Sequence, residues 1–366
     1  MPVGWAVGMH PDMIAMAKKK TIYDIADSSG TSPSTVAAVL NGTWAKRRIS
    51  PGTADRVRLV ARQLKYRANR QASGLRTARS GLVGMVLPLH DNRYFSSLSQ
   101  AFELEARRRG MCPVVVSALR DPEEERRTVA TLISHNVDQM FIAGATDADA
   151  LSVMCGEAGI PHINVDLPGT RAASVISDNY WGAAELTTAL VRRMRAANGA
   201  RADGIYFLGG IANDHNTRER MRAFGDVVAR ELGPPAPDQV RPCGYSPAAA
   251  ESDLRALYGK LGRLPPALLV NSTIAFEGVF RFLKSLPLEL FADFIVGCYD
   301  WDPYLSYLHF PVTMVRQDAE GIMRRAFELM EGDAPPAPEI TLIRPQLVLP
   351  DESAAVALRS DTGRRA

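Results

Sequence analysis

Long apolar runs are missing from this chain of 366 residues. No stretch reaches the roughly 18 consecutive apolar residues that a membrane-spanning helix requires. The first twenty residues do not form a secretion signal, because Pro2, Pro11 and Asp12 interrupt the apolar part and the basic cluster Lys18–Lys20 follows it. We therefore expect no membrane segment, no export, a cytoplasmic location and a disordered leader over residues 1–20.

Cysteine and histidine are scarce. The chain has four cysteines and six histidines, and none of them stands in a CxxC pair or at the spacing of a metal-binding cluster. The cysteines are far apart and are expected to be buried, reduced thiols: Cys112, Cys155, Cys243 and Cys298. The sequence thus predicts neither a disulfide framework nor a metal site, and we expect no cofactor.

Short catalytic signatures are also missing. The sequence has no GxSxG, P-loop, HExxH or GxGxxG pattern, which would indicate a hydrolase, a nucleotide-binding enzyme, a zinc protease or a dinucleotide site respectively. Gly209-Gly210 follows an apolar run, but two glycines alone do not indicate a phosphate-binding turn. We therefore assign no catalytic residue and do not expect an enzyme.

Basic residues are concentrated near the start of the chain. Residues 18–79 contain 14 lysines and arginines against three acidic residues, whereas residues 80–366 contain 29 basic and 36 acidic residues. A concentrated basic segment ahead of an acidic body is typical of a polyanion-binding module joined to a separate domain. A solvated charged surface would have the same composition, so charge alone leaves both interpretations open.

The basic segment has the pattern of three short helices. Thr21 and Ser32 can cap the first two helices, and Gly30 between them tolerates the left-handed conformation that ends a helix. A third helix is predicted after Ser50, with apolar residues at helical spacing. This arrangement is typical of a helix-turn-helix DNA-binding domain, here over residues 21–67, and an ordinary helical bundle is the alternative.

Two strings carry a resemblance to a known family: TIYDIADSSGTSPSTVAAVLNG and ISPGTADRVRLVARQLKYRANRQASGLRTARSGLVGMVLP. They resemble the lactose-repressor (LacI/GalR) family of bacterial transcription regulators. They are most similar to its fructose (catabolite) repressor branch, as is the insertion Trp44–Arg48. The resemblance covers nearly the whole chain. It implies a helix-turn-helix head, a hinge helix and a two-lobed effector-binding body that pairs with a second copy.

The resemblance also implies that the second helix enters the major groove. The residues of the head that match DNA-contacting positions of the family are Thr21, Ser32, Pro33, Ser34, Thr35, Ala38, Asn41 and Tyr66. The family usually has longer hydrogen-bonding side chains at the positions of Pro33, Ser34 and Ala38. Because Pro33 and Ala38 offer only apolar contact, for example to a thymine methyl, we expect base recognition to depend more on DNA shape or on the hinge.

Residues 68–79 match the hinge helix of the family. The hinge residues that the resemblance places on DNA are Asn69, Arg70, Ala72, Leu75 and Arg76. Leu75 is expected to insert into a minor-groove base step and kink the duplex. From the residues alone, a single leucine in a polar linker would make only a packing contact.

Beyond residue 80, short apolar runs alternate with helical patterns. The predicted strands are 82–87, 113–117, 139–143, 162–165, 204–208, 267–270, 294–297 and 312–315, and the predicted helices include 95–109, 123–135, 181–195 and 217–231. This alternation predicts parallel sheets covered by helices.

By resemblance, the body is an α/β two-lobed fold like the type I periplasmic binding proteins. We assign the body to residues 80–350, followed by a tail over 351–366. The first lobe is expected to comprise about 80–178 and 312–340, and the second lobe 179–311 and the C-terminal segment.

Ligands of parallel α/β sheets bind beyond the carboxyl ends of the strands. Acidic, amide and aromatic residues, which suit a sugar, are concentrated at these positions. The effector-binding candidates are Asp91, Tyr94, Phe95, Asp166, Arg220, Asn271, Asp300 and Trp301. The resemblance implies effector contact for Arg220, Asn271 and Asp300, whereas turn formation or helix capping is the alternative for Asn and Asp. Arg93, Arg218 and Arg220 are candidate contacts for a phosphate group.

These features predict a DNA-binding repressor of carbohydrate metabolism genes. It is expected to bind a pseudo-palindromic operator as a homodimer or tetramer and to be switched by a sugar or sugar phosphate. The branch resemblance favours a phosphorylated ketose, and a neutral sugar such as sucrose or ribose stays open. The alternatives are a sugar-binding protein without a regulatory role and an α/β enzyme that acts on a sugar.

Overall fold

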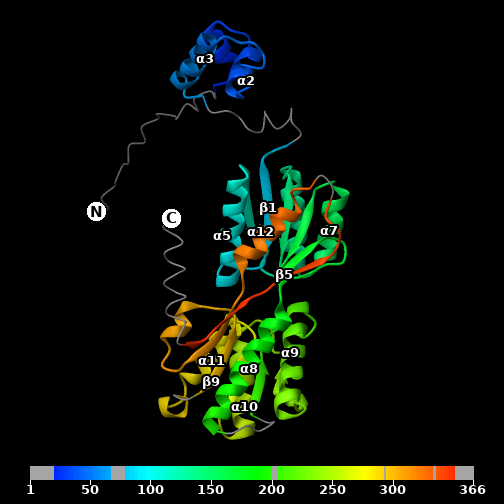
Figure 1. Ribbon diagram of the computed structural model, residues 1–366, viewed down its shortest axis with the longest axis vertical. Coiled ribbons are helices and arrows are strands. Elements are labelled where there is room, and N and C mark those ends of the chain that lie inside the picture. The colour runs from blue at the N-terminus through cyan, green and yellow to red at the C-terminus, as the bar shows by residue number, and fades with distance from the viewer. Residues whose placement is uncertain (1–19, 67–78, 199–203, 292–293, 333–334, 351–366) are drawn as a thin grey trace, which may run out of the picture. The chain divides into compact units, whose positions relative to one another are not determined.

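The computed structural model describes residues 20–66, 79–198, 204–291, 294–332 and 335–350 (Figure 1). The chain divides into two compact units, Met1–Thr77 and Ala78–Ala366, which we call the head and the body. The predicted hinge contacts lie outside the described residues: Asn69, Arg70, Ala72, Leu75 and Arg76. Residues 1–19 of the predicted leader over 1–20 and the whole tail over 351–366 also lie outside them.

The head contains the three helices that the sequence predicts: α1 (Ile22–Ser29), α2 (Pro33–Leu40) and α3 (Pro51–Gln63). Thr21 forms a capping box at the start of α1, and Gly30 ends this helix with a φ of 64°. The side chains of Ser32 and Ser50 cap α2 and α3 by accepting hydrogen bonds from backbone N–H groups of the first turn. The local sequence therefore sets where each helix begins.

Small apolar side chains fill the centre of the head. The buried ones, contributed by all three helices, include Ile25, Val36, Val39, Ala54, Val57 and Ala61. Trp44, from the insertion after α2, packs against this core, and the guanidinium of Arg58 lies 5.5 Å from the centre of its ring. Since α1 and α2 are joined by the Gly30 turn and supported by α3, the head is the predicted helix-turn-helix.

The body contains two six-stranded sheets (Figure 1). The first has the strand order β11-β5-β4-β3-β1-β2 and the second β12-β10-β9-β8-β6-β7. Neighbouring strands are parallel, except that β12 runs antiparallel to β10. We call the elements around the first sheet the first lobe and those around the second sheet the second lobe. The predicted two-lobed α/β fold is confirmed.

The strands are β1 (Leu82–Leu87), β2 (Cys112–Ser117), β3 (Gln139–Ala143), β4 (His162–Val165), β5 (Ser174–Ser177), β6 (Ile205–Leu208), β7 (Val240–Arg241), β8 (Ala267–Val270), β9 (Ile295–Tyr299), β10 (Val312–Arg316), β11 (Ile340–Ile343) and β12 (Gln346–Val348). The helices of the body are α5 (Arg93–Arg108), α6 (Pro122–Ser134), α7 (Ala148–Glu157), α8 (Asn179–Asn198), α9 (His215–Leu232), α10 (Pro247–Leu261), α11 (Thr273–Leu283) and α12 (Ala319–Leu329). Short 3-10 helices lie at η1 (Pro237–Gln239), η2 (Leu288–Leu290) and η3 (Pro303–Tyr307).

Each predicted strand coincides with an observed one to within two residues, and β5, β7, β11 and β12 were not predicted. The last three are short or lie at sheet edges, where no continuous apolar run is needed. β5 is fully buried but has only four residues, two of which are serines. Strand prediction thus failed where burial was incomplete or the apolar run was interrupted.

Aromatic packing holds α5 and α12 against the first sheet, where the two helices lie side by side (Figure 1). The rings of Phe102 in α5 and Phe327 in α12 lie 5.1 and 4.4 Å from that of Phe141 in β3, and 5.6 Å from each other. This packing attaches α12, which comes late in the chain, to the first lobe.

The assignment of residues 312–340 to the first lobe was wrong for β10. Val312 and Met314 are buried in the core of the second lobe, where β10 pairs with β9. The chain returns to the first lobe only at α12, pairs β11 with β5, and ends with β12 in the second sheet. The sequence of an apolar strand does not indicate which sheet the strand joins, so only the pairing with neighbouring strands decides the lobe to which β10 belongs.

All four cysteines are free. Cys155 and Cys298 are buried and Cys243 is half-buried, but Cys112 is exposed, contrary to the prediction, because it is the first residue of the edge strand β2. Within the described ranges, no helix has the length and apolar character needed to cross a membrane. In the same part of the chain, no group of three His, Cys, Asp or Glu side chains could hold a metal ion.

Candidate functional site

The exposed start of α2 carries a cluster of hydroxyl groups. The Ser32 hydroxyl lies 2.8 Å from that of Ser34 and 2.9 Å from that of Thr35, and the Ser32 and Ser34 side chains are exposed. Free backbone N–H groups and the helix dipole make a helix N-terminus attractive to anions, including phosphate. Pro33 is half-buried beside this cluster.

Ala38 does not fit the expected base contact. Its side chain is 3% exposed and belongs to the buried face of α2, so its methyl group is not available to a thymine. Thr21 and Asn41 are exposed, and Tyr66 is half-buried against the core of the head. The match to the family carries no information on this burial, which depends on how α2 packs in the head.

Exposed cations surround the helix-turn-helix. They include Lys46, Arg47, Arg48, Arg56, Arg58, Arg62 and Lys65, and among the described residues Arg58 pairs with Asp55 at 3.0 Å. Lysine and arginine side chains in such a group neutralise DNA phosphates and release counterions. The charge asymmetry of the sequence is therefore a real surface property of the head.

A polar pocket lies between the two lobes, at the carboxyl ends of the strands. The first lobe contributes Asn92, Tyr94, Phe95, Arg120, Asp166 and Leu167, and the second contributes Asp214, Asn216, Arg220, Tyr245, Ser272, Ile274, Asp300 and Gln317. We call this the inner pocket. Its position is the one expected of ligand sites in parallel α/β sheets.

Arg220 is held rigidly at the base of the inner pocket. Its side chain is 3% exposed, and its Nε donates to Asn179 Oδ1 at 2.8 Å and its Nη1 to the carbonyl oxygen of Asn271 at 2.7 Å. The guanidinium also lies 3.6 Å from the centre of the Tyr299 ring. Two hydrogen bonds and a stacking contact fix the direction of the remaining N–H groups.

A chain of amides connects Arg220 to the first lobe. Asn179 Nδ2 donates to Asn216 Oδ1 at 2.9 Å, and Asn216 Nδ2 donates to Asp166 Oδ1 at 3.1 Å. Asn179 starts α8, Asn216 lies in α9 and Asp166 follows β4. The hydrogen bonds therefore cross from the second lobe to the first within the pocket.

Two carboxyl groups of the inner pocket have raised pKa values. Burial, together with the charge of the neighbouring Asp214, raises the pKa of Asp166 to about 7, although Arg220 acts in the opposite direction. Burial raises the pKa of Asp300 to about 6, opposed by Arg220, and Gln317 Nε2 donates to Asp300 Oδ1 at 2.6 Å. Each carboxyl group also accepts a hydrogen bond from a side-chain amide, Asp166 from Asn216 and Asp300 from Gln317, and these bonds favour the ionised form.

Strained backbone positions the polar side chains. Arg120, Asp166 and Asp300 have φ values of 58°, 69° and 95°, a region that residues other than glycine rarely occupy. Such strain costs about 1–3 kcal/mol per residue and is concentrated at functional sites. All three residues line the inner pocket, which supports a ligand-binding role.

Several polar atoms around the inner pocket are buried without a hydrogen-bond partner in the described part of the chain. They include Arg120 Nε, Asn271 Oδ1 and Gln317 Oε1. A buried unpaired polar atom costs about 1–3 kcal/mol, so native proteins rarely keep several together without a function. These atoms point to a polar ligand.

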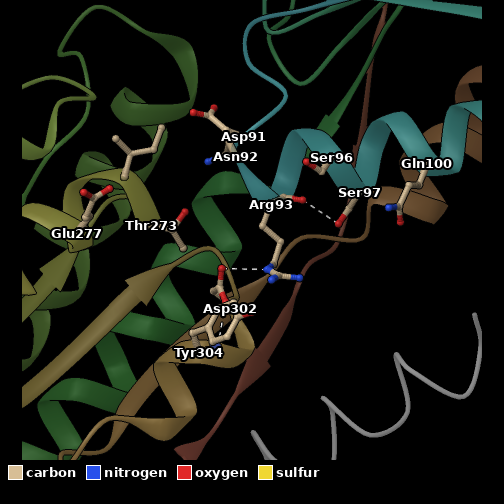
Figure 2. Close-up of a pocket in the computed structure, with 11 residues that line it drawn as sticks. Asp91, Asn92, Arg93, Ser96, Ser97, Gln100, Thr273, Glu277, Asp302 and Tyr304 are labelled. Atoms are coloured by element: carbon tan, nitrogen blue, oxygen red, sulfur yellow. Dashed lines mark hydrogen bonds and ion pairs between the residues drawn. The ribbon is translucent and has the colours of Figure 1, made fainter.

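The inner pocket adjoins a larger cavity, whose lining residues are drawn in Figure 2. The space left in the inner pocket is about 30 Å³, whereas the neighbouring outer cavity measures about 450 Å³. Asn92 and Ile274 line both. Figure 2 shows Arg93, from the first lobe, paired with Asp302, from the second. The distance between Nε and Oδ2 is 2.9 Å.

The structure brings most of the predicted effector residues together. Five of them line the inner pocket: Tyr94, Phe95, Asp166, Arg220 and Asp300. Asp91 lines the outer cavity instead, and Asn271 contacts Arg220 through its backbone carbonyl. Trp301 lines neither of these cavities, because it packs on the core of the second lobe with Arg316 stacked at 5.0 Å.

The expected phosphate contacts are only partly present. Arg93 is paired with Asp302 in the outer cavity, and Arg218 is exposed on α9, so of the three expected arginines only Arg220 lines the inner pocket. Arg120, Tyr245 and Gln317 also line the inner pocket but were not predicted from the sequence. Arg120 and Gln317 follow predicted strands, so the rule for strand ends could have found them, whereas Tyr245 follows the unpredicted β7.

A helix-turn-helix head with its own core and a two-lobed body with a polar pocket between the lobes define a ligand-responsive DNA-binding regulator. The family model for "Bacterial regulatory proteins, lacI family" matches residues 21–69, and that for "Periplasmic binding protein domain" matches residues 83–303. The chain belongs to the lacI family of bacterial regulatory proteins. It is a DNA-binding transcription regulator, and its relatives are regulators rather than enzymes.

Individual relatives agree with this assignment. The chain is 46% identical over 197 residues to the ribitol operon repressor of Klebsiella aerogenes, covering 53% of this chain and 71% of that repressor. It is 30% identical over 279 residues to the maltose regulon regulatory protein MalI of Escherichia coli (strain K12), covering 74% and 78%. The lac repressor dimer bound to operator has the same fold, with a TM-score of 0.74, 24% identity, and coverage of 90% and 98%.

Proposed function

We propose that this chain represses genes for the metabolism of a sugar or sugar alcohol and that its effector binds in the inner pocket. The proposal rests on one observation: Asp166 from the first lobe and Arg220 and Asp300 from the second line the same pocket, next to buried polar atoms without a hydrogen-bond partner. Carboxylate and guanidinium groups bind hydroxyls in directed hydrogen bonds, and the Tyr94 and Phe95 rings provide apolar surface. The names of the ribitol and maltose relatives support this class of effector.

On DNA, two copies of the chain are proposed to place their heads on a pseudo-palindromic operator. The hydroxyl groups at the start of α2 and the surrounding cations would contact phosphates, and Ser34 is the remaining polar candidate for a base contact. The hinge residues Asn69, Arg70, Ala72, Leu75 and Arg76 remain proposed DNA contacts. If Leu75 is a minor-groove wedge, L75A weakens specific binding more than non-specific binding, and an equal loss of both refutes the wedge.

The proposed switch is a change in how the lobes meet. An effector that contacts both lobes favours the arrangement in which its partners converge, and this shifts the population of lobe arrangements. A head over 21–67 and a hinge over 68–79 would connect that shift to operator affinity. DNA binding also supports a location in the cytoplasm, where the operator is accessible.

A ligand screen on the full chain tests the proposal. Sugars, sugar alcohols and sugar phosphates are added in turn while the unfolding temperature is measured. A ligand at about 100 times its Kd stabilises the folded state by about 2.7 kcal/mol. R220A should abolish this stabilisation and the effector response in an operator gel-shift assay. R218A changes an exposed arginine of the same helix and should behave like the parent chain. An effector response that persists in R220A would contradict the pocket assignment.

A further inference from the structure

Arg120 occupies an unusual place between the lobes. It follows β2 of the first lobe, and its guanidinium lies 4.7 Å from the centre of the Tyr245 ring in the second lobe. It also lies 5.8 Å from the ring of Phe95, in the first lobe. The two rings therefore flank the cation from opposite sides of the cleft, which limits the positions that its N–H groups can take.

The hydrogen-bond donors of Arg120 are free within the described residues. Its guanidinium makes no hydrogen bond or ion pair with any of them, and its Nε is buried without a partner. Arg220 in the same pocket donates two hydrogen bonds to the protein. An arginine at a pocket wall with unpaired donors is available to a ligand in a way that Arg220 is not.

A strained backbone turn directs the Arg120 side chain. Leu119 and Arg120 have consecutive φ values of 54° and 58°, both in the left-handed region. The Leu119 side chain is 70% exposed, so its burial does not account for this conformation. The strained turn directs Arg120 into the pocket.

Asp166 supplies an acceptor on the same first-lobe wall. Asn216 donates to its Oδ1, and the positive charge of Arg120, which lines the same pocket, lowers the pKa of this buried carboxyl group. Asp214 and Asp300 also line the pocket, which therefore holds three carboxyl groups and two arginines. Burial raises the pKa of Asp166 and Asp300 because this pocket disfavours negative charge, and the charge of a phosphate or carboxylate would meet the same penalty.

We infer that Arg120 and Asp166 together bind one hydroxyl group of an uncharged effector, and that this pair excludes effectors with a phosphate or carboxylate at that position. A hydroxyl group accepts a hydrogen bond from arginine and donates one to a carboxylate at the same time. A phosphate or carboxylate only accepts and is repelled by Asp166. An ammonium group only donates and is repelled by Arg120. This inference rests on the proposed sugar-sensing function and makes Arg120 a specificity residue.

Isothermal titration of the full chain with matched ligand pairs tests the inference. The pairs are ribitol with ribitol 5-phosphate and fructose with fructose 1-phosphate. We expect the uncharged member of a pair to bind at least tenfold more tightly. R120A and D166N should each weaken binding of that member tenfold or more, and D166N should also narrow the preference over the phosphate because one repelling charge is lost.

The double variant R120A/D166N separates a shared hydroxyl contact from two independent structural effects. If the two side chains bind one hydroxyl group together, either single substitution already breaks that contact. The double variant should therefore bind little worse than either single variant. R218A is the matched control and should retain the affinity and preference of the parent chain, and circular dichroism checks that each variant is folded.

Three results would overturn the inference. They are a preference for the phosphate that R120A removes, unchanged binding in folded R120A, and fully additive losses in the double variant. Failure of every ligand of both pairs to bind would overturn the sugar-sensing proposal itself, and this inference with it.

Discussion

Buried carboxyl groups give the inner pocket its chemical character. Burial raises the pKa of Asp166 to about 7 and that of Asp300 to about 6. An aspartate in an unfolded chain has a pKa of about 3.9. Between these values the folded protein retains protons that the unfolded chain has released. These two groups therefore make the free energy of unfolding fall as the pH rises from about 4 to 7.

The first prediction follows from this fall in the free energy of unfolding with rising pH. D166N removes the titrating group and keeps the shape of the side chain, so it should gain stability relative to the parent chain as the pH is raised from 5 to 8. Urea denaturation at both pH values measures the difference in the free energy of unfolding. A difference that does not change with pH would show that Asp166 titrates normally. E289Q replaces an exposed carboxyl group outside the pocket and serves as the control.

At the scale of elements, helix caps combine a structural role with a proposed role in DNA binding. Ser32 and Ser50 make equivalent caps, since each side chain accepts a hydrogen bond from the backbone N–H three residues later, at 3.2 and 3.3 Å. Only Ser32 also belongs to the hydroxyl cluster at the start of the proposed recognition helix α2.

The second prediction uses the two caps as a matched pair. S32A and S50A should each destabilise the head by about 1 kcal/mol, because both lose a cap of the same kind. S32A alone should weaken operator affinity further, through loss of the phosphate contact. Thermal unfolding and a gel-shift titration measure the two effects. Equal operator affinity in both variants would remove Ser32 from the proposed DNA contacts.

Close helix packing supports the second lobe. A Cβ atom added at Gly278 in α11 would lie 2.1 Å from the backbone oxygen of Pro247, at the start of α10. Backbone cannot move aside as the end of a flexible side chain can, so α10 and α11 would have to separate. Glycine is required here by contact rather than by φ.

The third prediction tests this contact. G278A should lower the free energy of unfolding of the body by about 1–3 kcal/mol, as overpacking does. G225A is the control, because Gly225 lies in α9 with nothing within 4 Å of the added Cβ. Alanine there should be neutral or stabilise by up to about 1 kcal/mol. Chemical denaturation compares the two variants, and similar effects would contradict the packing argument.

At the scale of the molecule, an ion pair that lines the outer cavity joins the two lobes of the body. The Arg93–Asp302 pair connects residues 209 positions apart, and Arg93 also lies 5.8 Å from the ring of Tyr304 (Figure 2). The Arg93 and Asp302 side chains are 30% and 20% exposed. Such a pair contributes about 0.2–1 kcal/mol, which is little for folding but enough to bias two lobe arrangements.

The fourth prediction concerns this pair. R93Q should speed release of the effector from the inner pocket by up to about fivefold, which corresponds to about 1 kcal/mol, because the closed arrangement loses one contact. R241Q breaks the Arg241–Asp253 pair inside the second lobe and should leave the release rate unchanged. Stopped-flow dilution measures both rates. Equal rates in R93Q and the parent chain would show that the pair does not hold the lobes together.

Local signals in the sequence determined the head and most strands of the body. The caps at Thr21, Ser32 and Ser50 and the turn at Gly30 act over a few residues, so they could be recognised without knowledge of the fold. Apolar runs marked the buried strands, and residues after them included Asp166, Arg220 and Asp300. The concentration of cations in the first 79 residues is likewise a property of the sequence itself.

Only the tertiary structure decided which of these residues meet. β10 joins the second sheet and α12 the first because of pairing and packing between segments far apart in the chain, and neither is encoded in local composition. For the same reason local sequence could not tell which candidates converge: Arg120, Tyr245 and Gln317 line the inner pocket, whereas Arg93, Arg218 and Trp301 do not. A side chain's chemistry is fixed by its type, but its neighbours are fixed by long-range packing, and binding depends on the neighbours.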